Sequence, residues 1–585
     1  MCGIAGLVTR DGSRPDVVVL DRLAAGIAHR GPDGVGRVVR GDTALIQLRL
    51  AIIDLVTGDQ PFFAPGGSAL VSNGEIYNNL ELRAAMADAP FRSRSDCEPP
   101  LFLYEREGEG FARRLRGMFA IAIHDEKRGR LVLTRDPFGI KPLYYAQTEG
   151  AFAFASEPQA LLAAGFGRRE VDGARRAELL QMKFTTGAAT IFPGIMRVLP
   201  GETLVVERGE IVARAVVPAL PAGKPEPIVH GAALKELDRV LSDSVAAHLQ
   251  SDVPYGLFLS GGIDSSAVLA LMTRLTGQRI RVLTMGWQGA GVADESREAE
   301  RLAGVQRAEC ERLEMGEADF WAFAPRIAAA IDDPTADAAV LPTWMLGRAA
   351  RAGGLKVTLC GEGADELFGG YSRYRKRRPP LSWISRKPRT KGVFGGAISG
   401  WRDGLDAAET AAARDRSALQ ATQAADVAEW LPNDLLTKLD RCLMVHGVEG
   451  RTPFLDPVVA KFAFRLPDAE KAGLRFGKVL LRDWLAKAFP EAGAYARKKG
   501  FKPPVGAWMQ ARAAVLGELV AGQAGVAEAL PGDVVRGAFA AAAENPQRAW
   551  SLLFYALWHA HHVMGVACEG DIGTVLSAAR ASASP

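Results

Sequence analysis

The chain has 585 residues, of which 48% are hydrophobic and 24% charged, and its formal charge is +4. This length predicts more than one domain, and the small net charge favours neither a nucleic acid nor a membrane surface as partner. The six cysteines form no Cys-x-x-Cys pair, which argues against a structural zinc site or a disulfide scaffold. The apolar run 4–8 is too short for a signal peptide, and no apolar run reaches the ~20 residues of a membrane helix, so we expect a cytoplasmic protein.

Short strand patterns dominate the first part of the chain. A helix is predicted over 16–28, because its apolar residues recur at helical spacing. Apolar runs at 117–124 and 130–134, separated by a charged turn, predict a hairpin, and 150–155 predicts a further strand. The pattern indicates a sheet-rich domain with some helices.

A proline-rich segment divides the chain. Residues 218–227 hold four prolines in ten positions, so this segment is predicted to be a linker. Beyond it, strand patterns at 256–259, 281–287 and 357–360 alternate with helical ones such as 265–276. This alternation predicts a parallel sheet covered by helices.

The last part of the chain, from about Asp406, is rich in alanine and is predicted to be helical. The basic stretch 373–391 is most simply a solvated loop, because most charge runs lie on the surface; an anion-binding role is the alternative. We therefore expect a first domain, a linker, a second domain and a tail, over residues 2–215, 216–230, 231–565 and 566–585.

The chain begins Met1-Cys2-Gly3. A lone cysteine is most often a small buried hydrophobe. Initiator methionine is normally removed when the next residue is small, however, and Cys2 would then carry a free α-amine with a pKa near ~8. An amine beside a thiol is the arrangement of an N-terminal nucleophile, in which one residue supplies both nucleophile and base.

Several polar residues among the first hundred are of the kinds that glutamine hydrolysis requires. The amide of Asn73 and the N–H of Gly74 are candidate donors to the oxyanion of a thioester-forming reaction. Arg49 is a candidate partner for the α-carboxylate of glutamine, and Glu75 and Asp96 for its α-ammonium. Simpler explanations exist: Asn73-Gly74 is also a common hairpin turn, and Arg49 could form a surface ion pair.

Together with the runs 29–34, 135–145 and 156–157, these residues resemble the class II glutamine amidotransferase domain. The resemblance covers about the first 160 residues. It implies an α+β N-terminal nucleophile hydrolase fold of four layers, αββα, and a place for Ile53 in the glutamine site. Gln47 stands where the resemblance predicts a histidine, and we expect this difference to affect local packing but not the chemistry.

A glycine-rich run follows the strand predicted at 256–259. It reads Leu259-Ser260-Gly261-Gly262-Ile263-Asp264-Ser265-Ser266, and a helix is predicted to begin within it. Glycines let the backbone approach a phosphate, N–H groups at a helix start bind anions, and Asp264 is a candidate ligand of Mg²⁺. The run lacks the Walker A pattern, and a plain glycine turn before a helix is the alternative.

A second glycine-rich run, Cys360 to Tyr371, follows the strand predicted at 357–360. Loops that follow parallel strands gather at one edge of the sheet, where ligands bind. The first run resembles the pyrophosphate loop of ATP pyrophosphatases, which cleave ATP to AMP and pyrophosphate. Both halves together resemble the glutamine-hydrolysing asparagine synthetase family over nearly the whole chain, with further matching runs at 294–296, 342–343, 440–441, 448–456 and 498–501.

The resemblance implies an adenine-nucleotide hydrolase-like α/β second domain, with a mainly parallel sheet and a helical C-terminal part. It implies that Asp264 and Asp365 hold Mg²⁺ and that Glu362 supports adenylation of the acceptor carboxylate. Lys499 would stabilise the leaving pyrophosphate. The residues implied to bind ATP are Leu259, Ser260, Gly261, Gly262, Asp264, Ser265, Ser266, Met285, Cys360 and Gly361.

The same resemblance implies a coupled reaction. Cys2 releases ammonia from glutamine, and the ammonia passes through an internal tunnel to an aspartyl-adenylate made from ATP and aspartate. The products are asparagine, AMP, pyrophosphate and glutamate. Alternatives are the same chemistry on another carboxylate, a β-lactam-forming relative that would not need Cys2, and a non-catalytic glutamine or nucleotide sensor. We expect small-molecule partners, no nucleic acid and no membrane, and a homodimer is the assembly we consider.

Overall fold

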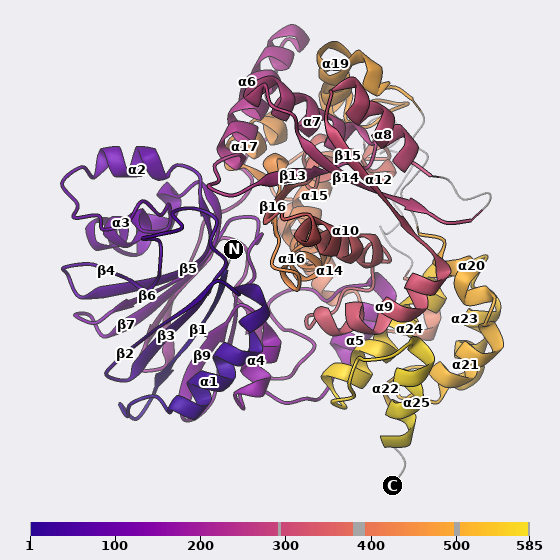
Figure 1. Ribbon diagram of the computed structural model, residues 1–585, viewed down its shortest axis with the longest axis horizontal. Helices are drawn as coiled ribbons and strands as arrows, with labels where there is room; N and C mark the ends of the chain where they lie inside the picture. The colour runs from indigo at the N-terminus through magenta and orange to yellow at the C-terminus, as the bar shows by residue number, and fades with distance from the viewer. Residues whose placement is uncertain (1, 290–293, 378–391, 497–502, 583–585) are drawn as a thin grey trace.

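The computed structural model describes residues 2–289, 294–377, 392–496 and 503–582 (Figure 1). Two antiparallel sheets occupy the first domain, and a third, parallel sheet lies within the helical second domain. Both halves thus have the sheet types that the sequence predicts. Among the described residues, no helix combines the length and the apolar character needed to cross a membrane.

Each antiparallel sheet has six strands. The first has the order β10-β8-β9-β1-β3-β2. Its strands are β1 (Cys2–Thr9), β2 (Gly34–Arg40), β3 (Thr43–Arg49), β8 (Tyr144–Gln147), β9 (Ala151–Ala155) and β10 (Ile195–Arg197). The second has the order β12-β11-β7-β6-β5-β4, with β4 (Phe62–Phe63), β5 (Ser68–Ile76), β6 (Gly117–Asp125), β7 (Arg130–Arg135), β11 (Glu202–Glu207) and β12 (Glu210–Val216).

Helices cover the outer face of each sheet. The helices α1 (Val17–Gly26) and α4 (Pro158–Ala163) lie against the first sheet, and α2 (Asn79–Ala85) and α3 (Pro99–Glu107) against the second. The two sheets face each other across a shared apolar layer. This is the four-layer αββα arrangement that the resemblance implies.

Side-chain alternation along the strands places polar groups between the two sheets. On β1, Ile4 and Val8 join the layer between the sheets, whereas Ala5 and Leu7 pack beneath α1. Successive side chains on a strand point to opposite faces, so Cys2 shares the inner face with Ile4.

The same alternation applies to β3, the neighbour of β1, and to β5 of the facing sheet. On β3, Gln47 and Arg49 share the face of Leu45, and on β5, Asn73 and Glu75 share the face of Val71; Leu45 and Val71 both belong to the inner layer. The hairpin-turn alternative for Asn73-Gly74 is therefore wrong, because both residues lie inside β5.

The third sheet is parallel throughout, with the order β15-β14-β13-β16-β17. Its strands are β13 (Tyr255–Phe258), β14 (Arg281–Trp287), β15 (Glu309–Met315), β16 (Val357–Leu359) and β17 (Glu449–Arg451). Residues 217–229 contain no helix or strand and are described throughout, as expected of a linker. They join β12 to the first helix of the second domain.

Helices cover both faces of the parallel sheet (Figure 1). One face carries α6 (His230–His248), α7 (Ile263–Thr276) and α8 (Ser296–Val305); the other carries α10 (Val340–Ala352) and α16 (Thr437–Met444). Further helices include α9 (Glu317–Ala330), α11 (Ala364–Phe368), α12 (Ser372–Arg375), α14 (Asp403–Ala412), α15 (Ala418–Ala425), α17 (Pro457–Arg465) and α19 (Val479–Ala488).

The C-terminal part is helical, as predicted. It comprises α20 (Val505–Gln510), α21 (Ala513–Ala521), α22 (Ala524–Ala527), α23 (Gly532–Ala540), α24 (Pro546–His562) and α25 (Ile572–Ser582). In Figure 1 these helices group at the lower right, and α24 packs on α9. The stretch 373–391 includes part of α12, but its residues 378–391 lie outside the described residues.

Candidate active sites

Cys2 is the first residue of β1, its side chain is buried, and two polar side chains contact it, one at the backbone and one at the thiol. Its backbone N–H donates to Asn73 Oδ1 at 3.1 Å, and Gln47 Nε2 donates to its Sγ at 2.9 Å. Burial raises the pKa of the Cys2 thiol above its ordinary value of 9.0. The thiol is therefore protonated at neutral pH and needs a base in order to act as a nucleophile.

The contact from Gln47 corrects one expectation. Gln47 was expected to affect local packing alone, but its amide donates directly to the Cys2 thiol. Gln47 and Cys2 lie on neighbouring strands, and both face the inter-sheet space. Since the side chain at position 47 contacts the candidate nucleophile, the difference at this position is not confined to local packing.

The Asn73 side chain is fully buried, and only its amide oxygen has a hydrogen-bond partner among the described residues. Its Oδ1 accepts from Cys2, whereas its Nδ2 has no hydrogen-bond partner among the described residues. A buried donor without a partner is costly, so it requires an explanation. An amide that reaches Cys2 through its oxygen and keeps its N–H groups unused is suited to receive a developing oxyanion.

Gly74 follows Asn73 in the strand and is sterically required. A Cβ atom there would lie 2.2 Å from the carbonyl oxygen of Met118 and 2.6 Å from Phe119 Cα. Those atoms belong to β6, with which β5 pairs, so the two strands approach too closely for any side chain at this position.

The Arg49 guanidinium lies at a turn. Its Nη2 donates to the carbonyl groups of Asp54 at 2.5 Å and Ile53 at 3.5 Å, and its Nη1 pairs with Asp59 at 2.7 Å. Asp59 is 78% exposed, so this ion pair is weak and exchangeable. The backbone carbonyls fix the cation, which leaves it suited to bind a carboxylate.

Glu75 and Asp96 form a buried acidic pair. Burial raises the pKa of both, and for Glu75 the neighbouring Asp96 adds to the increase. Glu75 lies 3.1 Å from Arg451 Nη2 of the second domain, and Asp96 accepts from the Ile76 N–H at 2.6 Å. Two carboxylates in one buried place attract a cation, as binding of an α-ammonium group requires.

The second group of predicted residues surrounds two cavities at the carboxyl end of the parallel sheet. A cavity of about 250 Å³ is lined by Leu259, Ser260, Asp264, Ser265, Met285, Cys360, Gly361, Glu362 and Asp365, among others. A second cavity of about 510 Å³ shares Ser260, Asp264 and Asp365 with it and adds Gly261 and Gly262. The loops after β13 and β16 thus meet at one edge, as predicted. Ser266 is described and buried in α7, but within the described chain it lines neither cavity.

The two predicted metal ligands converge on a lysine that the sequence analysis missed. Lys478 Nζ lies 2.7 Å from both Asp264 carboxylate oxygens and 2.7 Å from Asp365 Oδ1. Lys478 precedes α19 with a φ of +57°, a conformation that non-glycine residues rarely adopt. An isolated lysine after a glycine carries no motif, so only the fold reveals it.

The carboxylates fit the predicted Mg²⁺. Mg²⁺ takes oxygen ligands and typically uses one or two carboxylates together with substrate phosphates. Asp264 and Asp365 provide two such groups at one cavity edge. No set of three or more His, Cys, Asp or Glu side chains within the described ranges is arranged to hold a metal, so substrate oxygens would have to complete the coordination.

Glu362 lines the smaller cavity together with Asp264 and Asp365. Burial raises its pKa above the ordinary value, and the nearby Lys438 of α16 opposes that increase. Tyr371 donates to Glu366 of α11 at 2.8 Å, and burial raises the pKa of Glu366 to about 7. The predicted Lys499 lies outside the described residues.

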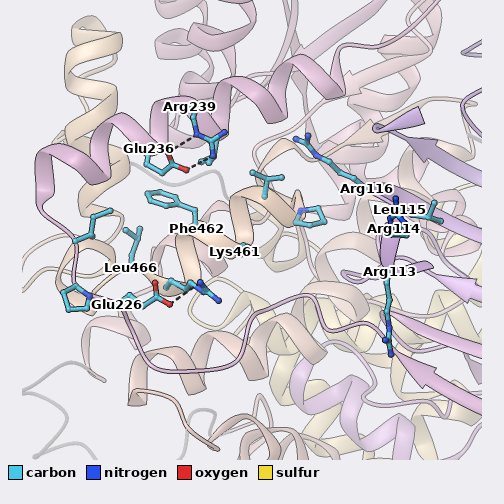
Figure 2. Close-up of a pocket in the computed structure, with 16 residues that line it drawn as sticks. Arg113, Arg114, Leu115, Arg116, Glu226, Glu236, Arg239, Lys461, Phe462 and Leu466 are labelled. Carbon is cyan, nitrogen blue, oxygen red and sulfur yellow. Dashed lines mark hydrogen bonds and ion pairs between the residues drawn. The ribbon is translucent and has the colours of Figure 1, made fainter. Parts of the chain in front are cut away.

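A further cavity of about 640 Å³ lies where the first domain, the linker, α6 and α17 meet (Figure 2). Within the described chain, no predicted site residue lines it. Its basic side chains are largely paired: Arg239 with Glu236 at 2.6 Å, and Arg465 with Glu226 at 3.2 Å. Because acidic neighbours already offset this charge, we assign the cavity no part in the chemistry.

Comparison with known protein families matches both halves of the chain. Residues 1–216 match the model described as "Glutamine amidotransferase domain", and residues 236–560 match the one described as "Asparagine synthase". The two matched segments flank the proline-rich linker.

Similar proteins extend over most of the chain. A putative glutamine-hydrolyzing asparagine synthetase of Mycobacterium tuberculosis is 32% identical, over 91% of this chain and 92% of that protein. Asparagine synthetase 1 of Bacillus subtilis is 28% identical, over 96% and 97%. Amidase chry2 of Gibberella zeae is 32% identical, over 66% and 62%. The chain therefore belongs to the glutamine-hydrolysing asparagine synthetase family and is an ATP-dependent ligase that takes its nitrogen from glutamine.

Proposed function

We propose that the chain is a glutamine-dependent asparagine synthetase with two coupled sites. With Met1 removed, the α-amine of Cys2 takes the thiol proton, and Sγ attacks the side-chain amide of glutamine. The Asn73 amide and the Gly74 N–H stabilise the oxyanion. Ammonia leaves, and water hydrolyses the thioester to glutamate.

Arg49, Glu75 and Asp96 orient the glutamine. The guanidinium binds the α-carboxylate, with the Ile53 carbonyl fixing its position, and the two acidic side chains bind the α-ammonium. The contacts that support this assignment are those of Arg49 with the turn at Ile53 and the close approach of the two buried carboxylates.

At the second site, the acceptor carboxylate attacks the α-phosphorus of ATP, and pyrophosphate leaves. Asp264 and Asp365 would hold Mg²⁺, which supplies charge neutralisation at the phosphates when bound. Lys478, together with the predicted Lys499, offsets the negative charge of the pyrophosphate. Ammonia then attacks the acyl-adenylate and releases AMP and asparagine, with Glu362 near the reacting carboxylate.

The ammonia travels between the sites inside the protein. A single apolar cluster includes Leu50, Ile52 and Met118 of the first domain and Leu259 and Leu455 of the second. Because this cluster includes residues of both domains, and Leu259 also lines the smaller cavity, it supports a passage without bulk water, where ammonia stays unprotonated.

One observation carries the glutaminase half of the proposal: the Asn73 amide holds Cys2 with its oxygen and leaves its N–H groups without a partner among the described residues. The names of the similar proteins support aspartate as the acceptor. Domain boundaries near residues 215 and 231, a homodimeric assembly and a cytoplasmic location complete the proposal.

A second candidate is the same chemistry on another carboxylate. It is favoured by the similarity to amidase chry2 of Gibberella zeae, which shares 32% identity. Acceptor choice depends on the shape of the small cavity beside Glu362, where a single methylene changes discrimination by roughly 10- to 200-fold.

The test is analysis of the products formed from glutamine, ATP and aspartate by mass spectrometry, with glutamate as the competing acceptor. Asparagine together with AMP confirms the proposal, whereas AMP and pyrophosphate formed only with another carboxylate would favour the second candidate. In parallel, Cys2→Ala should abolish glutamine use and keep synthesis from added ammonia. Glutaminase activity retained by that variant would refute the role of Cys2.

A further inference from the structure

Arg30 is a fully buried cation that touches both the nucleophile and the second domain. It ends the short helix η1 (Ala28–Arg30), and its Nε donates to the backbone carbonyl of Cys2 at 3.2 Å. Its Nη1 and Nη2 donate to Asp440 Oδ2 and Oδ1 at 2.7 and 3.0 Å. Nη1 also donates to Glu157 at 2.6 Å. All three nitrogen atoms of the guanidinium thus donate hydrogen bonds.

Asp440 is itself firmly placed. It lies on α16, is 4% exposed and accepts from Arg441 Nη1 at 2.9 Å, while Arg441 Nε pairs with Asp332 at 2.8 Å. Burial raises the pKa of Asp440, but the adjacent Arg30 outweighs it, and the pKa lies below its ordinary value. The Asp440 carboxylate therefore stays charged, and both of its oxygens accept hydrogen bonds from Arg30.

Cys2 needs such a support because of its place in the chain. Once Met1 is removed, no preceding peptide fixes the residue, and chain ends fray unless they are held. Asn73 binds its nitrogen, Gln47 its sulfur and Arg30 its carbonyl. Of these three supports, the one through Arg30 depends on a residue of the other domain.

We propose that Asp440 is a positioning residue for the glutaminase nucleophile: acting through Arg30, this side chain of the second domain fixes the carbonyl, and hence the thiol, of Cys2. The inference rests on the proposed role of Cys2. The helix α16 that carries Asp440 also contributes Lys438 and Leu439 to the 250 Å³ cavity. One helix therefore links the geometry of the two sites.

The chain contains a matched control for this ion pair. Arg197 of β10 donates to Asp333 of the second domain through Nε at 2.7 Å and Nη2 at 2.6 Å, and both side chains are buried. The other partners of Arg197 are Thr185 and the carbonyl groups of Gly187 and Ala189. This pair also joins the two domains through two donors of one guanidinium, here Nε and Nη2, and within the described chain it does not bond to Cys2.

The experiment compares Asp440→Asn and Asp333→Asn in the full chain. Glutaminase is measured as glutamate release without ATP, and the second site as pyrophosphate release with ammonia. Asp440→Asn should lower the glutaminase kcat by about 100-fold, the usual cost of a misplaced catalytic group, with a much smaller change in KM. Its ammonia-dependent rate and the glutaminase kcat of Asp333→Asn should stay near the unmodified values.

Unchanged glutaminase kcat in Asp440→Asn, or an equal loss in Asp333→Asn, would overturn the inference. Should Asp440→Asn also lose its ammonia-dependent rate, Asp440→Glu becomes the deciding variant. This variant keeps the negative charge but displaces it by one methylene. It should lower the glutaminase kcat while pyrophosphate release persists. Full glutaminase activity in Asp440→Glu would overturn the inference. Cys2→Ala distinguishes failure of the proposed function from failure of this inference. If Cys2→Ala retains glutaminase activity, the proposed role of Cys2 is wrong. If Cys2→Ala is inactive while Asp440→Asn is fully active, only the role of Asp440 is wrong.

Discussion

The two candidate sites differ in how far the protein alone completes them. Around Cys2, strand alternation and backbone hydrogen bonds hold the nucleophile, the amide donor and the cation in one buried space. At the second site, Asp264 and Asp365 lie in the first turns of α7 and α11, and Lys478 balances the two carboxylates. The first site is preorganised, whereas in the proposed function substrate phosphates and Mg²⁺ would complete the second.

The largest test of this comparison is Asn73→Ala. If the amide is a fixed oxyanion donor, its loss should lower the glutaminase kcat by about 10²- to 10³-fold and leave the ammonia-dependent rate intact. Glutamate release and pyrophosphate release measure the two rates. Asn78→Ala is the control, because that amide donates to the Arg114 carbonyl instead. A loss confined to KM would contradict a role in the transition state.

Lys478→Met probes the opposite site. Removing the cation leaves two carboxylates facing each other, so ammonia-dependent pyrophosphate release should fall by about 10²-fold, while glutaminase measured without ATP is unchanged. Lys487→Met on the exposed face of α19 serves as the matched control. Equal losses at both sites would show that Lys478 supports the fold and not one reaction.

Arg49→Gln sharpens the assignment of the glutamine site. A hydrogen bond to a charged group contributes about 2 kcal/mol, so the KM for glutamine should rise roughly 30-fold with a small change in kcat. Steady-state kinetics of glutamate release measure both constants. An unchanged KM would place the α-carboxylate of glutamine elsewhere.

The pH dependence of glutaminase tests the state of the thiol. Burial raises the pKa of Cys2 above 9.0, and the reactive thiolate is the deprotonated form. The kcat/KM for glutamine should therefore increase about tenfold per pH unit, from about pH 6 to about pH 8. Assays without ATP exclude the separate effect of ammonia deprotonation. A plateau already reached at about pH 7 would contradict a base with the pKa near ~8 of an ordinary α-amine.

Much of the first site was predictable because its residues lie close together in the sequence. Arg49 lies on β3, the neighbour of β1, whereas Asn73 and Glu75 lie on β5 of the facing sheet. All three residues share the inner side with Cys2, and alternation in a strand needs no long-range information. The contact of Gln47 with the thiol was not predicted. Which polar group reaches a given atom depends on strand pairing, here the pairing of β1 with β3, and the sequence pattern does not specify that register.

The sequence by itself predicted the strand-rich first part, the alternating strands and helices of the second part and the two glycine-rich loops, because turn residues and periodicity are local properties. Only the tertiary structure decided that Lys478 lies between Asp264 and Asp365 and that Asp440 binds Arg30 from 410 positions away. Lysine, arginine and aspartate are common surface residues, so their identity carries no signal until the fold buries them. Burial then makes each such charge depend on oppositely charged neighbours, and those neighbours are brought together by packing between segments that are distant in the sequence.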